Sequence, residues 1–207
     1  PWSAAKQIDA CGEVVIEAFG CHLPEKYRER IGSVSPQPIW INLEYLTAEA
    51  FADDLHLMAS PQNDGTHKTF YFPGFSDRTG GVILGDWDRV TAQQVPESLA
   101  VYWQQRQTDS LSISIFQYPS TSLDNWLMNL SHSLVQQQLV ADLFVTPQQN
   151  ITCLSLPNIQ WIHLPFLPQA DYDWLLAHCD LNLVRGEDSF VRAQWAGKPF
   201  IWDIYPQ

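Results

Sequence analysis

Residues 180–207, DLNLVRGEDSFVRAQWAGKPFIWDIYPQ, predict a strand, an acidic turn, a helix and a second strand. The apolar run from Leu181 to Val184 is typical of a strand that is covered on both faces in a parallel sheet. Ser189 is the expected N-cap of the helix, and Gly197 its expected end. Strand character returns from Phe200 to Tyr205. The stretch therefore predicts one right-handed β-α-β unit.

Both strands of such a unit end at the same edge of the sheet, where α/β proteins bind their ligands. Backbone N–H groups at the helix start can hold a diphosphate, together with the Arg185 guanidinium and the hydroxyls of Ser189 and Tyr205. Glu187 cannot bind phosphate because like charges repel, but it can accept two hydrogen bonds from the hydroxyls of a ribose. This edge is therefore a candidate site for a nucleoside diphosphate.

Asp188 and Gln207 are the remaining members of this candidate site. The alternative interpretation is structural. Glu187 and Asp188 would then only complement the positive end of the helix dipole, and Arg185 would pair with one of them at the surface.

The run VRGEDSFVRAQWAGKPFIWDIYPQ is similar to the signature of the bacterial elongation factor P arginine rhamnosyltransferases. VVIEAFGCHLP, PIWINLEYL and FYFPGF resemble other blocks of that family, so that the resemblance extends over nearly the whole chain. It implies an α/β protein of the GT-B type, with two Rossmann-like halves that face a cleft. It also implies an inverting transfer of rhamnose from dTDP-β-L-rhamnose to an arginine of elongation factor P, without a metal or other cofactor.

The resemblance also implies roles for individual residues. Arg185 would stabilise the charge on the departing diphosphate and Glu187 would fix the ribose, so these two are the expected catalytic residues. The family's general base is an aspartate in a loop that opens its N-terminal half, and this sequence shows no such loop. We therefore expect an internal segment of a longer enzyme, with an incomplete first half. Such a segment should bind nucleotide but transfer sugar poorly or not at all.

The composition limits the partners. With 45% hydrophobic residues and a net charge of -12, the chain is globular and acidic, which argues against a nucleic-acid or anionic-membrane partner. No apolar run is long enough to span a membrane. Four cysteines without a C-x-x-C pair fit reduced thiols in a cytoplasmic protein, and six scattered histidines predict no zinc site. We expect a monomer.

In the first half, predicted strands and helices alternate along the chain, as in a doubly wound sheet: strands at 14–16, 39–43 and 69–72, helices at 24–32 and 47–58. Glu17 and Glu44 each follow a strand and could grip an arginine side chain, with Tyr45 or Phe75 stacked on its guanidinium plane. Alternatively, each glutamate is a solvated turn residue or pairs internally. We place the domain boundary near Thr108, so that residues 1–107 form the acceptor side.

Residues 108–207 would then form the nucleotide-sugar domain, truncated at its C-terminus. Phe116 and Tyr118 follow its first strand and can contact the nucleotide or the sugar. Gln169 can read the pyrimidine edge, and the Tyr172 ring can stack on the base. The family has Gln and an aromatic residue at these places, with Phe where this chain has Tyr172. The alternatives are core packing for Phe116 and a place in the next hydrophobic layer for Tyr172.

Two other functions remain open on the sequence. One is a non-catalytic protein that binds a nucleotide sugar on the same fold, since fold does not determine function. The other is a nucleotide-sugar epimerase, which has the same two-domain architecture but needs no protein acceptor.

Overall fold

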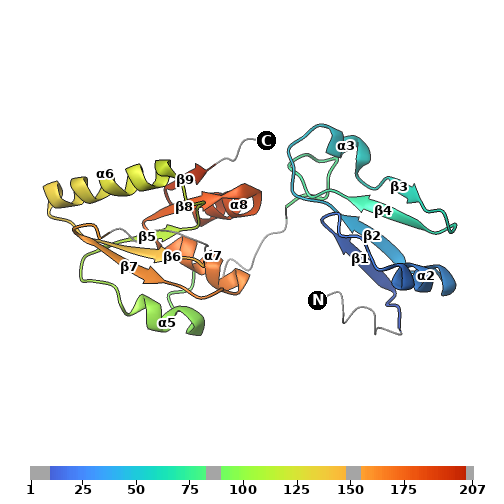
Figure 1. Cartoon of the computed structure of the whole chain (residues 1–207), viewed down its shortest axis with the longest axis horizontal. Coiled ribbons are helices and arrows are strands. Elements are labelled where there is room, and N and C mark those ends of the chain that lie inside the picture. Colours follow the sequence, from blue (N-terminus) through green and yellow to red (C-terminus); the bar gives the residue numbers. More distant parts are fainter. Residues whose placement is uncertain (1–9, 83–89, 148–154, 204–207) are drawn as a thin grey trace. The chain divides into compact units, whose positions relative to one another are not determined.

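The computed structural model describes residues 10–82, 90–147 and 155–203, and divides the chain into two compact units, Pro1–Ile83 and Leu84–Gln207 (Figure 1). The division comes earlier than the boundary that we expected near Thr108. Helix α5 (Glu97–Trp103) precedes that position, yet its Leu99 is fully buried in a core cluster with Phe144 of the second unit. The helix therefore packs on the second sheet and is part of the second unit.

The second unit is a five-stranded sheet in which every pair of neighbouring strands is parallel. Its strands are β5 (Leu111–Ile115), β6 (Ala141–Val145), β7 (Ile159–His163), β8 (Leu181–Arg185) and β9 (Phe200–Asp203), in the order β7-β6-β5-β8-β9. Three longer helices connect them, α6 (Thr121–Gln137), α7 (Gln169–His178) and α8 (Gly186–Ala196). The predicted α/β class with parallel sheets is confirmed.

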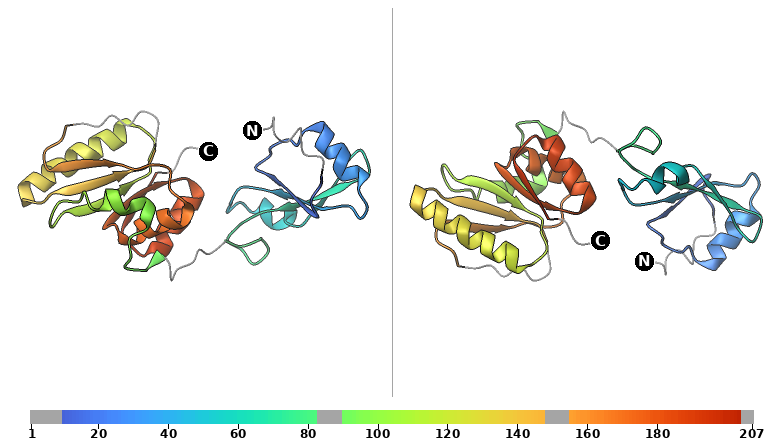
Figure 2. Two further views of the ribbon diagram at one scale, coloured as in Figure 1. Left: turned by 90° about the horizontal axis from the view of Figure 1, so that it is seen from below. Right: turned by 90° about the horizontal axis from the view of Figure 1, so that it is seen from above.

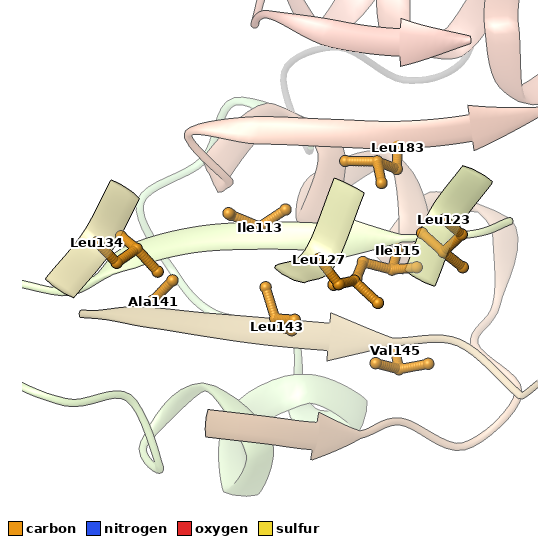
Figure 3. Packing of buried hydrophobic residues seen from close by; sticks show 9 residues of the cluster. All are labelled: Ile113, Ile115, Leu123, Leu127, Leu134, Ala141, Leu143, Val145 and Leu183. Carbon is orange, nitrogen blue, oxygen red and sulfur yellow. The ribbon is translucent and has the colours of Figure 1, made fainter. Parts of the chain in front are cut away.

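Helices cover both faces of this sheet (Figure 2). On one face, Leu123, Leu127 and Leu134 of α6 point onto apolar side chains of β5, β6 and β8 (Figure 3). The other face buries Phe144 and Trp174 in a cluster with residues of α5 and α7. Burial on both faces also extends to polar side chains of these strands, among them Ser112, Ser114, Asp142 and Asn182.

The predicted β-α-β unit at the end of the chain is present as β8, α8 and β9. Its helix begins earlier than expected, because Arg185 occupies the N-cap position and the predicted cap, Ser189, lies inside the first turn. Gly186, with φ of 69°, makes the bend between strand and helix, a backbone conformation that glycine adopts without a steric penalty. Gly197 ends the helix in the left-handed region as predicted.

The first unit is a four-stranded sheet in the order β1-β2-β4-β3, formed by β1 (Val14–Ala18), β2 (Ile39–Leu43), β4 (His67–Tyr71) and β3 (Ala59–Pro61). β1, β2 and β4 are parallel, and β3 is antiparallel to β4. Within residues 10–82, the helices of this unit are α2 (Glu25–Ser33) and α3 (Phe51–Leu55). α3 is shorter than the predicted helix at 47–58, and β3 was not among the strands predicted at 14–16, 39–43 and 69–72.

One face of this sheet packs under α2, where Val15 and Trp40 form a core cluster with Ile31. The side chains that alternate with them, Val14, Ile16 and Ile39, are more than half exposed. β1 and β2 therefore bury the apolar side chains of one face and expose those of the other.

Candidate functional site

The candidate site lies where the sheet of the second unit changes winding direction. β5 and β8 are neighbours, and the chain leaves β5 toward β6 on one side and β8 toward β9 on the other. The carboxyl ends of two such strands open a crevice, and this is where doubly wound sheets bind ligands. The predicted residues Phe116 and Tyr118 follow β5, and the predicted segment 185–189 follows β8.

Arg185 is the side chain that joins these two segments. Its guanidinium carbon lies 3.8 Å from the centroid of the Tyr118 ring and 4.5 Å from that of the Phe116 ring. None of the ion pairs found in the described ranges uses Arg185. Aromatic faces attract a cation without cancelling its charge, so the guanidinium remains able to bind an anion.

The first turn of α8 follows directly. Its backbone N–H groups have no carbonyl partner inside the helix and lie at the positive end of the helix dipole. The Ser189 hydroxyl, predicted to reach a phosphate, is buried and donates a hydrogen bond to the carbonyl of Arg185. Glu187 is half-buried, and Asp188 is exposed.

Asp188 is held by Arg192, whose Nε donates to Asp188 Oδ2 at 2.7 Å. Arg192 Nη1 also donates to Oδ2 of the buried Asp173 on α7, at 2.8 Å. Partial burial lowers the pKa of Arg192, but the hydrogen bonds and charges of Asp188 and Asp173 outweigh this effect and raise its pKa above the usual value. Arg192 therefore stays charged and links the N-terminal turns of two helices.

Tyr172 and Gln169 come from the start of α7. The Tyr172 ring meets Phe116 edge to face, with 6.0 Å between centroids, and also packs against the buried side chains between α7 and α8. Burial raises the pKa of its hydroxyl, which has no hydrogen-bond partner within the described residues. The ring thus packs in the hydrophobic layer between α7 and α8, which was the alternative to stacking on the base. Gln169 is exposed, with its Nε2 3.4 Å from Asp173 Oδ1.

Two residues at this edge were missed by the sequence analysis. Gln117 is buried and donates from Nε2 to the Val184 carbonyl at 2.8 Å, which ties the end of β5 to the end of β8. Phe166 is 87% exposed in the loop between β7 and α7. The prolines that flank this loop, Pro165 and Pro168, were the available signal for a rigidly presented ring. Tyr205 and Gln207, both predicted site residues, lie outside the described residues.

The predicted acceptor residues lie together at the carboxyl ends of β1 and β2. Glu17 is only 3% exposed and pairs with Lys68, whose Nζ lies 3.1 Å from Glu17 Oε2, so the alternative of an internal pair holds for this residue. Lys68 also donates to Asn42 Oδ1 at 3.3 Å, and the Asn42 amide donates to Glu44. Glu17 and Glu44 thus belong to one hydrogen-bonded network.

Tyr45 is 62% exposed and stacks on Phe19, with 4.6 Å between ring centroids. Phe19 was not predicted as a site residue. It has φ of 56°, a conformation that is uncommon outside glycine and that tends to occur at functional sites. Phe75, the other predicted stacking residue, is 55% exposed.

Within residues 10–82, 90–147 and 155–203, no group of three or more His, Cys, Asp or Glu side chains is arranged to hold a metal ion. Over the same ranges, no helix is both long enough and apolar enough to cross a membrane. Cys11, Cys21 and Cys179 are free thiols.

The known proteins that this chain resembles are rhamnosyltransferases of one family. The profile of the family described as elongation factor P (EF-P) rhamnosyltransferase EarP matches residues 1–207. A protein-arginine rhamnosyltransferase of Pseudomonas putida is 41% identical over 226 aligned residues, which cover 100% of this chain and 59% of the relative. One of Pseudomonas aeruginosa is 38% identical, with the same coverage. The chain thus spans about three fifths of the length of these curated relatives.

A solved structure that concerns EarP-mediated arginine glycosylation of translation elongation factor EF-P matches with a TM-score of 0.50 and 33% identity. The match covers 64% of this chain and 49% of the solved one.

Proposed function

Since the chain belongs to the EF-P rhamnosyltransferase family, EarP, we propose that its second unit binds the nucleotide-sugar donor of a protein-arginine glycosyltransferase. The observation that carries this proposal is the position of Arg185. It lies at the switch point of the sheet, on the rings of Phe116 and Tyr118, beside the first turn of α8. A fixed cation next to the backbone amides at the positive end of a helix suits the diphosphate of a nucleotide sugar.

The proposed donor is dTDP-β-L-rhamnose. Arg185 and the amides of α8 would bind its diphosphate, with Tyr205 and Gln207 as further proposed ligands from beyond β9. Glu187 would accept hydrogen bonds from the sugar of the nucleoside, and Asp188 would keep its hydrogen bond from Arg192. The base would lie toward Gln169 and the edge of the Tyr172 ring, against Phe116.

The proposed reaction is an inverting displacement. A guanidinium nitrogen of the acceptor arginine forms a bond to the anomeric carbon of rhamnose while the bond from that carbon to the diphosphate oxygen breaks. The departing dTDP takes the electron pair, and a general base takes the proton from nitrogen. Arg185 and the α8 amides stabilise the negative charge that grows on the diphosphate, a contribution that we propose needs no metal ion.

For the acceptor we propose an arginine of EF-P, bound by the first unit in a GT-B arrangement with the two units facing a cleft. This is supported by the name of the family and by the likeness to the structure that concerns arginine glycosylation of EF-P. Glu44 and the exposed Tyr45 are the proposed contacts, a carboxylate for the guanidinium edge and a ring for its face. Glu17 would act through the network that it shares with Asn42. The proposed setting is the cytoplasm, where translation factors act, with a monomeric enzyme.

Calorimetric titration with dTDP and with UDP, in buffer that contains EDTA, tests the donor site. We expect binding without a metal ion and a preference for dTDP. Arg185→Gln should weaken dTDP binding by about tenfold or more, since it removes a charge-assisted contact to the diphosphate.

Arg106→Gln is the matched control, because Arg106 also lies over an aromatic ring, 3.8 Å from the centroid of Trp103. It precedes β5, at the opposite end of the strand, so its loss should leave dTDP affinity unchanged. Equal affinity of the Arg185→Gln and wild-type chains would remove the proposed role of Arg185.

A further inference from the structure

Trp202 ties β9 to the first turn of α8. It is paired in register with Val184 of β8, and its indole Nε1–H donates a hydrogen bond of 3.0 Å to the Gly186 carbonyl. Its ring stacks on Phe190 of α8, with 3.9 Å between centroids and 21° between planes. Two separate contacts from one side chain therefore fix this turn relative to the edge strand.

The hydrogen bond acts on the peptide group that opens the helix. A trans peptide is planar, so the Gly186 carbonyl and the Glu187 N–H lie in one plane and point in opposite directions. A carbonyl oxygen accepts two hydrogen bonds, and Trp202 supplies one from outside the helix. Whatever holds the carbonyl also sets the direction of the Glu187 N–H, which lies at the positive end of the helix dipole.

Other contacts hold the residue before the bend. The Ser189 hydroxyl donates to the Arg185 carbonyl, and the Arg185 guanidinium lies on the rings of Phe116 and Tyr118. The bend at Gly186, which lacks a side chain to restrict it, is thus fixed from both sides before a ligand arrives. Amides that are already oriented bind an anion more tightly than amides that must be ordered on binding.

We infer that Trp202 is a positioning residue for the donor diphosphate. Its indole N–H orients the peptide plane at the start of α8 and thereby raises the affinity for a nucleoside diphosphate, without contact between Trp202 and the nucleotide. The inference rests on the proposed donor site and adds to it a residue outside the phosphate-binding turn itself.

Trp202→Phe tests this inference, because it removes the N–H donor and keeps an aromatic ring to stack on Phe190. dTDP and thymidine are titrated separately into the chain, with binding followed by NMR so that weak affinities are also measured. The dissociation constant for dTDP should rise roughly three- to tenfold, the range that one hydrogen bond is typically worth. Thymidine, which has no phosphate, should bind as it does to the wild-type chain.

Trp126→Phe is the matched control. Trp126 lies on α6 and packs against the core cluster beneath that helix, so this substitution should change neither the affinity for dTDP nor that for thymidine. A Trp202→Phe chain that binds dTDP with wild-type affinity overturns the inference, and so does an equal loss for dTDP and thymidine, which would indicate a general distortion. A wild-type chain that binds neither dTDP nor thymidine overturns the donor site itself, and the inference with it.

A measurement on the wild-type chain does not depend on how the variant folds. The indole N–H resonance of Trp202 should be protected from hydrogen exchange, and it should shift when dTDP is added but not when thymidine is added. An indole resonance that does not respond to dTDP contradicts the proposed role.

Discussion

At the scale of single residues, the partners of a side chain decide what it can do. Arg185 and Arg192 are both guanidinium groups near the start of α8, but Arg192 pairs with two carboxylates and Arg185 lies on two aromatic rings. The carboxylates cancel most of the charge of Arg192, whereas the rings leave that of Arg185 in place. Of these two residues, Arg185 is therefore the one suited to bind an anion.

Tyr172 allows a prediction at this scale. Its hydroxyl is buried without a partner in the described part of the chain, which is unfavourable for a polar group. Tyr172→Phe should therefore leave the free energy of unfolding unchanged or raise it by about 1 kcal/mol, with nearly normal dTDP binding. Tyr172→Ala should lower it by about 3 kcal/mol or more, because it leaves a cavity between α7 and α8. Denaturant unfolding measures both changes.

Tyr71→Phe is the contrasting substitution, because the Tyr71 hydroxyl donates to the Gly80 carbonyl at 3.0 Å. Its removal should destabilise the first unit by about 1 kcal/mol. If Tyr172→Phe lost as much stability as Tyr71→Phe, the Tyr172 hydroxyl would have a partner in solution, and its proposed burial without one would be wrong.

At the scale of elements, α7 and α8 are joined by a charged link as well as by apolar packing. Arg192 bridges Asp173 on α7, whose side chain is 7% exposed, and Asp188 on α8, whose side chain is 65% exposed. The two halves of this link should differ in energy, because a buried carboxylate depends on its partner whereas an exposed one can be hydrated.

Arg192→Gln should lower the free energy of unfolding by about 2–4 kcal/mol, since it leaves the Asp173 carboxylate buried without its cation. Asp188→Asn, the matched substitution on the exposed side, should cost less than about 1 kcal/mol. Urea unfolding of the two variants checks the order. Similar losses in both would show that Asp173 is not the critical partner of Arg192.

At the scale of the whole molecule, the two units differ in how completely their sheets are covered. Helices pack on both faces of the second sheet (Figure 2). In the first sheet, Val14, Ile16 and Ile39 are exposed on the face opposite α2. A sheet with one uncovered apolar face has less buried area to hold it together, so the first unit should open more readily.

Hydrogen exchange measured by mass spectrometry tests this difference on the intact chain. Backbone amides of β1 and β2 should exchange faster than those of β5 and β6, and denaturant should unfold the chain in two steps, the first unit before the second. Equal protection of the two sheets in this chain would contradict the prediction and would mean that the exposed face of the first sheet is covered in solution.

Much of the local structure could be predicted from the order of the amino acids. The run from Leu181 to Val184 and the strand character from Phe200 predicted β8 and β9, and Gly197 predicted the end of α8, because periodicity and backbone conformation are local properties. The sequence also placed Phe116, Tyr118 and Arg185 at one edge, since parallel strands end together. One error was local as well. Ser189 was assigned as the cap, although the permissive φ of Gly186 lets the helix begin earlier.

The partner that each side chain contacts could be seen only in the folded chain. Glu17 is paired with Lys68, which is 51 positions away in the sequence, and Trp202 of β9 donates a hydrogen bond to Gly186, which follows the neighbouring strand β8. The same packing joins α5 to the second sheet, beyond any boundary that composition indicates. Such pairings depend on strand order and on which face is buried. These are properties of the assembled sheet, and no short stretch of sequence contains them.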